Sequence, residues 1–192
     1  MDGTIDGDRF LPRDYEAVYD LRKRRDKRNS VLFRGHPGDR LAYRGPADTS
    51  DKEELEEPYR RNVLDPLTTF LAIPHRIQRG QLRVGDGFAF PVFDSSRRFD
   101  AEGRVAGRAR VDLPGGSAAD ALVICMVLRP IAGFRSKKDA DEDVEDAPRP
   151  VTLYVSADGR ATPLRAEIPI AFFAAVIQLV ADCGDQPCTL PR

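Results

Sequence analysis

Short apolar segments alternate with turn signals along the second half of the chain, between residues 80 and 181. Across 104–112, apolar and polar residues follow one another singly, as in a strand with one buried face. Ala-Asp-Gly-Arg at 157–160 is a typical hairpin turn. We therefore expect successive antiparallel strands, over residues 87–94, 97–113, 121–130, 149–156 and 164–170.

One short helix is predicted before these strands. Asp65 is a favourable N-cap, and the proline that follows it fits the first helical position. Leu67, Phe70 and Leu71 then share one face of a helix. The pattern predicts an amphipathic helix from 66 to about 73, ended by Pro74.

The first 60 residues carry a less regular pattern. Tyr15 and Val18 fit either a helix or a strand, and the basic cluster at 22–28 is interpreted as a solvated turn between two strands. Residues 36–60 are polar and are interpreted as a surface loop with one helical turn over 51–57.

Length and charge limit the class of protein. A chain of 192 residues fits a single domain, 1–192, and its 30 basic residues balance 31 acidic ones. A nucleic-acid partner is therefore not expected. No apolar run approaches the roughly 18 residues of a transmembrane helix, so no such segment is expected. The charged segment 135–148 predicts a flexible loop.

Signatures of catalysis and metal binding are missing from the sequence. It contains no phosphate-binding loop, no dinucleotide fingerprint and no nucleophile elbow. Its two histidines lie away from the cysteines, so neither a metal site nor a cofactor is expected. Cys183 and Cys188 bracket a turn and form either a disulfide or a pair of reduced thiols. Asp94 with Arg97 and Arg98 either steadies a hairpin turn or holds an anion.

Four blocks in a fixed order resemble one family. These are VLDPLTTFL from Val63, PVFDSSRRFD from Pro91, ALVICMVLRPIAGFR from Ala121, and the ending LYVSADGRATPLRAEIPIAFFAAVIQLV. Together they are similar to the "domain of unknown function 3108" family of exported bacterial envelope proteins. The resemblance implies a periplasmic protein whose signal peptide and first strands are missing here. It also favours a strand over residues 172–181, which alone fit either a buried helix or a strand.

The resemblance implies a curved antiparallel sheet or open half-barrel wrapped around the one short helix. Cys125 matches a family cysteine whose usual partner is absent from this sequence. Cys125 is then either a buried thiol or a partner of Cys183 or Cys188. The family brings no catalytic residues, so catalysis is not the favoured interpretation.

The leading hypothesis is an envelope protein that binds a lipid-like, apolar or amphipathic ligand in the concave face of its sheet. The alternative is that these side chains form a packed core. A second hypothesis is an interaction module that joins an envelope complex through sheet edges. A third is a glycan-acting enzyme with Asp94 and Asp100 as paired carboxylates. The candidate groove residues are Phe70, Phe90, Phe93, Asp94, Arg97, Arg98, Val123 and Phe134.

Overall fold

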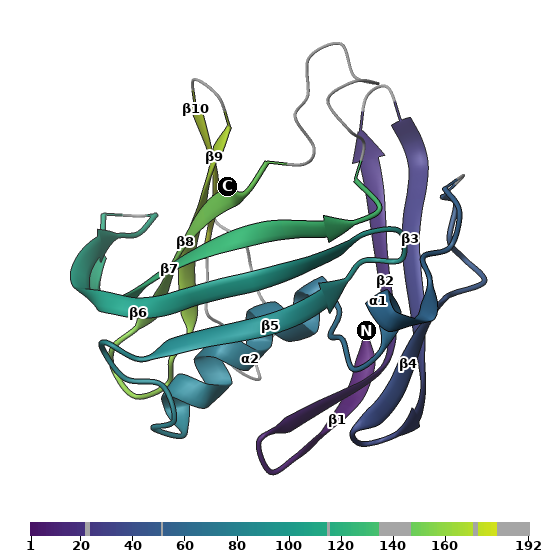
Figure 1. The fold of residues 1–192 in the computed structure, drawn as a ribbon. Coiled ribbons are helices and arrows are strands. Elements are labelled where there is room, and N and C mark those ends of the chain that lie inside the picture. The colour runs from purple at the N-terminus through teal and green to yellow at the C-terminus, as the bar shows by residue number, and fades with distance from the viewer. Residues whose placement is uncertain (22–23, 51, 115, 135–146, 171–172, 180–192) are drawn as a thin grey trace. The chain divides into compact units, whose positions relative to one another are not determined.

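A computed structural model describes residues 1–21, 24–50, 52–114, 116–134, 147–170 and 173–179 (Figure 1). These residues form two antiparallel sheets and two helices, and the described strands close no barrel. The prediction of a mainly β, antiparallel fold with a short helix is confirmed. The loop predicted at 135–148 lies almost wholly outside the described residues, as do Cys183 and Cys188.

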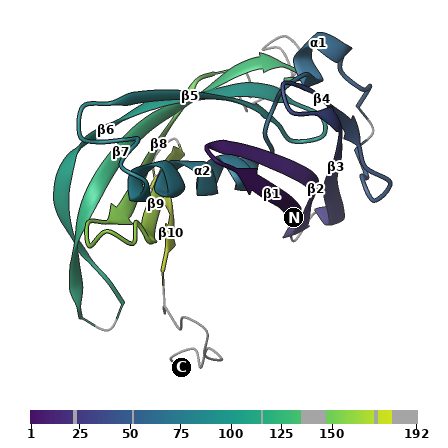
Figure 2. The same cartoon turned by 90° about the horizontal axis from the view of Figure 1, so that it is seen from below.

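The N-terminal sheet has the strand order β1-β2-β3-β4. Its strands are β1 (Asp2–Asp6), β2 (Arg9–Leu21), β3 (Arg24–His36) and β4 (Asp39–Arg44). Figure 2 shows β1 folding back on β2 as a hairpin. The interpretation of 36–60 as a loop was wrong for residues 39–44, which form β4 after a turn at Pro37-Gly38, whereas the described residues of 45–56 lie in neither a helix nor a strand. Glycine before aspartate suits a turn between alternating strands, and this signal was overlooked.

The second sheet has the strand order β10-β9-β8-β7-β6-β5. Its strands are β5 (Gly87–Phe93), β6 (Arg98–Asp112), β7 (Ala118–Ala132), β8 (Arg149–Ser156), β9 (Pro163–Ile170) and β10 (Phe173–Gln178). Every strand predicted for this half is present, including the ambiguous one near the end. The hairpin predicted at 157–160 is also present, since Ser156 N–H donates to Thr162 O at 2.8 Å.

The chain divides into two compact units. The first comprises Met1–Ala72, Ala89–Glu102 and Leu128–Pro148, and the second comprises Ile73–Phe88, Gly103–Val127 and Arg149–Arg192. Each unit contains its own apolar cluster. In the first, the cluster is Tyr15, Val31, Phe33, Ala42, Val63 and Phe93. In the second, Val111, Ala121 and Leu164 pack together.

Helix α2 (Pro66–Gln78) is longer than predicted. Asp65 caps it as expected, accepting a hydrogen bond from Thr68 N–H at 2.8 Å. Pro74 lies inside the helix and lacks the N–H that would bond to residue 70, yet the helix continues because Ala72 and Ile73 are fully buried. The end is set instead by Gly80, whose positive φ and bonds to the last turn form a glycine C-cap.

The buried face of α2 is not the predicted one. Leu67 and Leu71 are 43% and 40% exposed, whereas Thr68 and Thr69 are buried. The sequence pattern predicted that the larger apolar side chains would be buried. The threonines can be buried instead, because their hydroxyl groups form hydrogen bonds within the helix. Thr68 Oγ1 donates to Asp65 Oδ2 at 2.5 Å, and Thr69 Oγ1 donates to Asp65 O at 2.9 Å.

The second helix, α1 (Glu57–Arg60), is a single turn that begins where the predicted one ended. It lies beside β4 (Figure 1). Arg60 is buried and connects this turn to the sheet, because its guanidinium donates to Ala42 O at 2.8 Å and to Leu55 O at 2.7 Å. Within the part of the chain that the structure describes, neither helix has the length and apolar character needed to cross a bilayer.

The Asp65 cap predicts an unusual pH dependence. Burial raises the pKa of the Asp65 carboxyl, although hydrogen bonds from Thr68 oppose this. The folded state therefore binds the proton more tightly than the unfolded state. The protonated Asp65 carboxyl contributes its full stabilisation below the unfolded pKa of about 4. This contribution is lost as the pH rises through the folded pKa. In urea unfolding from about pH 3 to about pH 7, the unfolding free energy of the Asp65→Asn variant should rise relative to that of the wild type as the pH rises.

Asp158 provides a control of opposite sign. Hydrogen bonds from Ser156 and Arg160 lower the pKa of the exposed Asp158 carboxyl to about 2. Its contribution is present above the unfolded pKa and is lost as the pH falls toward about 2. Asp158→Asn should therefore lose stability relative to the wild type as the pH rises. The same pH trend in both variants would contradict the assignment for Asp65.

Candidate functional site

The residues predicted to line a groove have different environments. Phe90, Phe93 and Asp94 are buried, and Phe70, Arg97, Arg98, Val123 and Phe134 are partly buried. Val123 belongs to the second unit and the others to the first. Phe93 is part of the apolar cluster of the first unit. The structure brings Asp94, Arg97 and Phe134 together, while Arg98 pairs with Asp100 at 2.6 Å.

Asp94 organises the turn between β5 and β6. The residue is only 4% exposed. Its Oδ1 accepts the backbone N–H of Arg97 at 2.8 Å and that of Ser96 at 3.2 Å. Its Oδ2 accepts Arg97 Nε at 2.8 Å and lies 2.6 Å from Arg97 Nη2. The carboxylate is thus engaged in holding the turn, and Arg97 also stacks over the Phe134 ring at 5.7 Å.

The same turn is covered by its neighbours in the first unit. An added Cβ on Gly133 would clash with Ser96 O, so Gly133 packs directly on the turn. Lys52 Nζ donates to Gly133 O at 2.7 Å. A hairpin turn is ordinarily exposed, whereas here the Asp94 carboxylate and the backbone N–H groups of Ser96 and Arg97 are paired with one another. The β5–β6 turn therefore has a structural role, because contacts within the first unit hold it in place.

Ser95 is the strained residue of this turn. It has a φ of 91° and is fully buried, and its Oγ has no hydrogen-bond partner among the described residues. A positive φ at the first central position of a hairpin favours glycine. Ser95→Gly should therefore raise the unfolding free energy by about 1 kcal/mol, measured by urea denaturation.

Ser96→Gly is the matched control for that variant. Ser96 does not have a positive φ, and its Oγ lies 3.5 Å from Asp94 Oδ1. Glycine at position 96 relieves no backbone strain and raises the conformational entropy of the unfolded chain, so the unfolding free energy should fall. If both glycines stabilise, relief of strain at Ser95 is not the cause.

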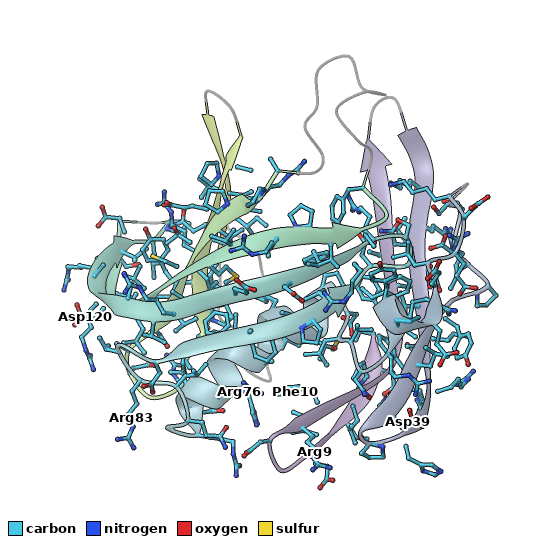
Figure 3. All side chains as sticks on the ribbon, in the orientation of Figure 1. Arg9, Phe10, Asp39, Arg76, Arg83 and Asp120 are labelled. Atoms are coloured by element: carbon cyan, nitrogen blue, oxygen red, sulfur yellow. The ribbon has the colours of Figure 1, made fainter. Side chains whose placement is uncertain are left out.

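A cavity of about 310 Å³ lies on the N-terminal sheet, within the first unit. All four strands contribute to its lining: Asp2, Gly3, Thr4, Leu11, Arg13, Phe33, Arg34, Gly35 and Arg40. It lies near the β1–β2 and β3–β4 turns, where Figure 3 labels Arg9 and Asp39. This volume is at the lower end of the range typical for small-molecule sites.

Arg40 crosses the sheet to reach this cavity. It pairs with Gly35 on β3, which offers no side chain to block its path, and its Nη2 donates to Pro12 O on β2. The backbone of Arg40 is fixed by Asn62, whose Oδ1 accepts Arg40 N–H at 2.9 Å. Asn62 N–H donates in turn to Arg40 O at 2.7 Å. These bonds occupy the outer edge of β4 and hold Arg40 in place.

The pleat of the sheet decides which charges face the cavity. Side chains alternate between the two faces of a strand, so Arg34 points away from the face shared by Phe33, Gly35 and Arg40. On the cavity face, Arg13 pairs with Asp2. Among the described residues, no carboxylate lies within ion-pair distance of Arg40. The side chains on this face therefore leave one positive charge uncompensated.

The Arg40 guanidinium is incompletely satisfied. Its Nε is buried and has no hydrogen-bond partner within the described ranges. Burial also lowers the pKa of the Arg40 guanidinium. A buried donor without an acceptor costs about 1–3 kcal/mol, so a ligand that supplied an acceptor to Nε would be stabilised by it. Leu11 and Phe33 supply the apolar part of the same lining.

Sequence reasoning did not identify this site. Its residues come from four strands and become neighbours only through their register. The Gly-Asp-Arg sequence at 38–40 could have indicated the β3–β4 hairpin, but not the path of Arg40 over Gly35. No cluster of side chains suited to a metal ion occurs in the described part of the chain. Cys125 is an exposed free thiol rather than a buried one.

A family model described as "Protein of unknown function (DUF3108)" matches residues 1–180. The chain therefore belongs to this family, as the four sequence blocks indicated. No curated protein and no solved structure matches the chain.

Proposed function

We propose that this member of the DUF3108 family is a non-catalytic binding protein of the bacterial cell envelope. Its ligand is an amphipathic anion, held in the cavity of the N-terminal sheet. The observation that supports this most is Arg40, a guanidinium without a counter-charge beside Leu11 and Phe33. Ligand sites combine an apolar lining with a few polar groups in this way.

The two parts of the ligand would bind through different forces. Its apolar chain would cover the exposed part of Leu11, and removal of apolar surface from water contributes about 25 cal/mol per Å². Its anionic group would accept hydrogen bonds from Arg40, and charge-assisted bonds of this kind are about twice as strong as neutral ones. A periplasmic location is part of the proposal and rests on the resemblance to exported proteins. Osmotic-shock release would support it, and retention in the cytosolic fraction would contradict it.

A fluorescent fatty-acid titration tests the binding proposal. Dansyl-undecanoic acid should gain fluorescence on binding and be displaced by decanoate but not by decanol. Arg40→Gln should weaken binding by about tenfold or more, because the charged donor is lost. The control is Arg9→Gln, which removes the same charge from the same sheet at an exposed position outside the cavity lining. Equal binding by both variants would exclude the cavity as the site.

A second function, as an interaction module, is favoured by one strand. β10 lies at the end of its sheet, and its adjacent residues Val176 and Ile177 are 47% and 65% exposed. Neighbouring side chains point to opposite faces, so both faces of this edge strand are uncovered. A photo-crosslinker at Ile177 in the native envelope should capture one reproducible protein. Capture of none would remove this candidate.

A further inference from the structure

We propose that Asp2 sets the charge class of the ligand, so that the cavity selects a singly charged carboxylate over a phosphate dianion. This inference rests on the proposed function and specifies the ligand of the same site. It follows from the charges on the cavity face of the sheet. Three arginines and one carboxylate line the cavity, namely Arg13, Arg34, Arg40 and Asp2. Arg34 pairs with Leu41, so its side chain points to the other face of the sheet, and two arginines remain on the cavity face.

Asp2 neutralises one of the two arginines. The Asp2 carboxylate forms an ion pair with Arg13 across the β1–β2 ladder. Arg13 is held further by Asp14, whose Oδ2 lies 3.8 Å from Arg13 Nε. Arg40 is thus the cation left for a ligand. One uncompensated positive charge matches one carboxylate, whereas a phosphate monoester brings a charge of about −1.5 to −2 at pH 7.

Repulsion adds to this mismatch. Asp2 lines the same cavity of about 310 Å³ that the head group would occupy. A second negative charge on the ligand would lie near the Asp2 carboxylate without a free cation to balance it. Like charges close together repel one another, and specificity commonly uses such a repulsive element.

The donor pattern of Arg40 also suits a carboxylate. One donor, Nη2, is already used by Pro12 O. Nε remains buried and without an acceptor among the described residues. A planar carboxylate can accept from the donors that remain on one guanidinium. A tetrahedral phosphate presents more acceptor oxygens than this single arginine can satisfy.

The experiment compares two head groups on one alkyl chain. Decanoate and decyl phosphate are titrated by calorimetry into the wild type at about pH 8, where the phosphate is a dianion. The wild type should bind decanoate at least about tenfold more tightly. In Asp2→Asn, Arg13 keeps only its longer contact with Asp14, and the net positive charge of the cavity lining rises by one. The preference should then fall by about tenfold or reverse.

Asp6→Asn is the matched control. It removes an exposed carboxylate from the same strand, outside the cavity lining, and should leave the preference unchanged. Both substituted residues are exposed, so the variants should fold, and a urea curve checks this. Tighter binding of decyl phosphate by the wild type would overturn the inference, as would an unchanged preference in Asp2→Asn.

A third ligand separates this inference from the proposed function. Acetate carries the carboxylate without the chain and should bind far more weakly than decanoate. If acetate and decanoate bind equally, the proposal that the ligand is amphipathic is wrong, although the cavity can still select a carboxylate. If decyl phosphate and decanoate bind equally, the proposed function stands and the role of Asp2 fails. If no ligand binds, both are wrong.

Discussion

Replacement of Asp94 by alanine should lower the unfolding free energy by about 3 kcal/mol, as measured by urea denaturation. The carboxylate is buried and accepts the backbone N–H groups of Ser96 and Arg97 as well as the Arg97 guanidinium. Alanine would remove the acceptor of both backbone N–H groups, and Arg97 would lose its close ion pair while its stacking on Phe134 remains. The loss of this buried acceptor and of the ion pair is the main cost.

Asp158→Ala is the control for this effect. Asp158 makes a similar set of bonds in its own hairpin turn, since its Oδ1 accepts Arg160 N–H at 3.0 Å and its Oδ2 accepts Arg160 Nε at 2.8 Å. That carboxylate is exposed, so water can replace each lost bond. Its loss of stability should be much smaller. Equal losses would show that burial of the Asp94 turn contributes little.

Gly35→Ala should also destabilise the protein strongly, by about 2–4 kcal/mol. Gly35 has a φ of 101°, and an added Cβ would clash with the backbone O of Asp39. The same Cβ would lie 3.4 Å from Arg40 Cα, so the strand that carries Arg40 would have to shift. Binding of dansyl-undecanoic acid should therefore be lost together with stability, even at a temperature where the variant remains folded.

Gly38→Ala isolates the effect of the close approach. Gly38 has a φ of 91°, and a Cβ there would meet nothing within 4 Å. Only the cost of the left-handed backbone remains, about 1–2 kcal/mol. Ligand binding should be retained. If Gly38→Ala lowers stability and binding as much as Gly35→Ala does, the close approach of β4 at Gly35 is not the reason that a glycine is needed there.

The sequence predicted local structure well where one segment carries the whole signal. The strands after residue 80, the hairpin at 157–160 and the Asp65 cap follow from alternation, turn chemistry and capping. The prediction was wrong where tertiary burial overrides local preference. Helix α2 passes through Pro74 and buries threonines rather than leucines, because their hydroxyls bond within the helix.

The candidate site was beyond sequence reasoning for a different reason. Arg40 and Leu11 are separated in the chain and meet only because β3 pairs with β2 and β4 in one particular register. A shift of one residue would move every side chain to the other face. Single-sequence patterns fix which residues alternate, but not which strands pair. Arg34 and Arg40 are chemically alike in sequence, and only the register separates them.

An NMR titration with decanoate tests the central claim most directly, because it locates the ligand in the intact chain. Amide shifts should be largest at Thr4, Leu11, Gly35 and Arg40, and small in β8 and β9. Arg40→Gln should reduce these shifts, and Arg9→Gln, outside the cavity lining, should preserve them. Shifts concentrated outside the N-terminal sheet, or none at saturating decanoate, would contradict the assignment of this cavity as the binding site.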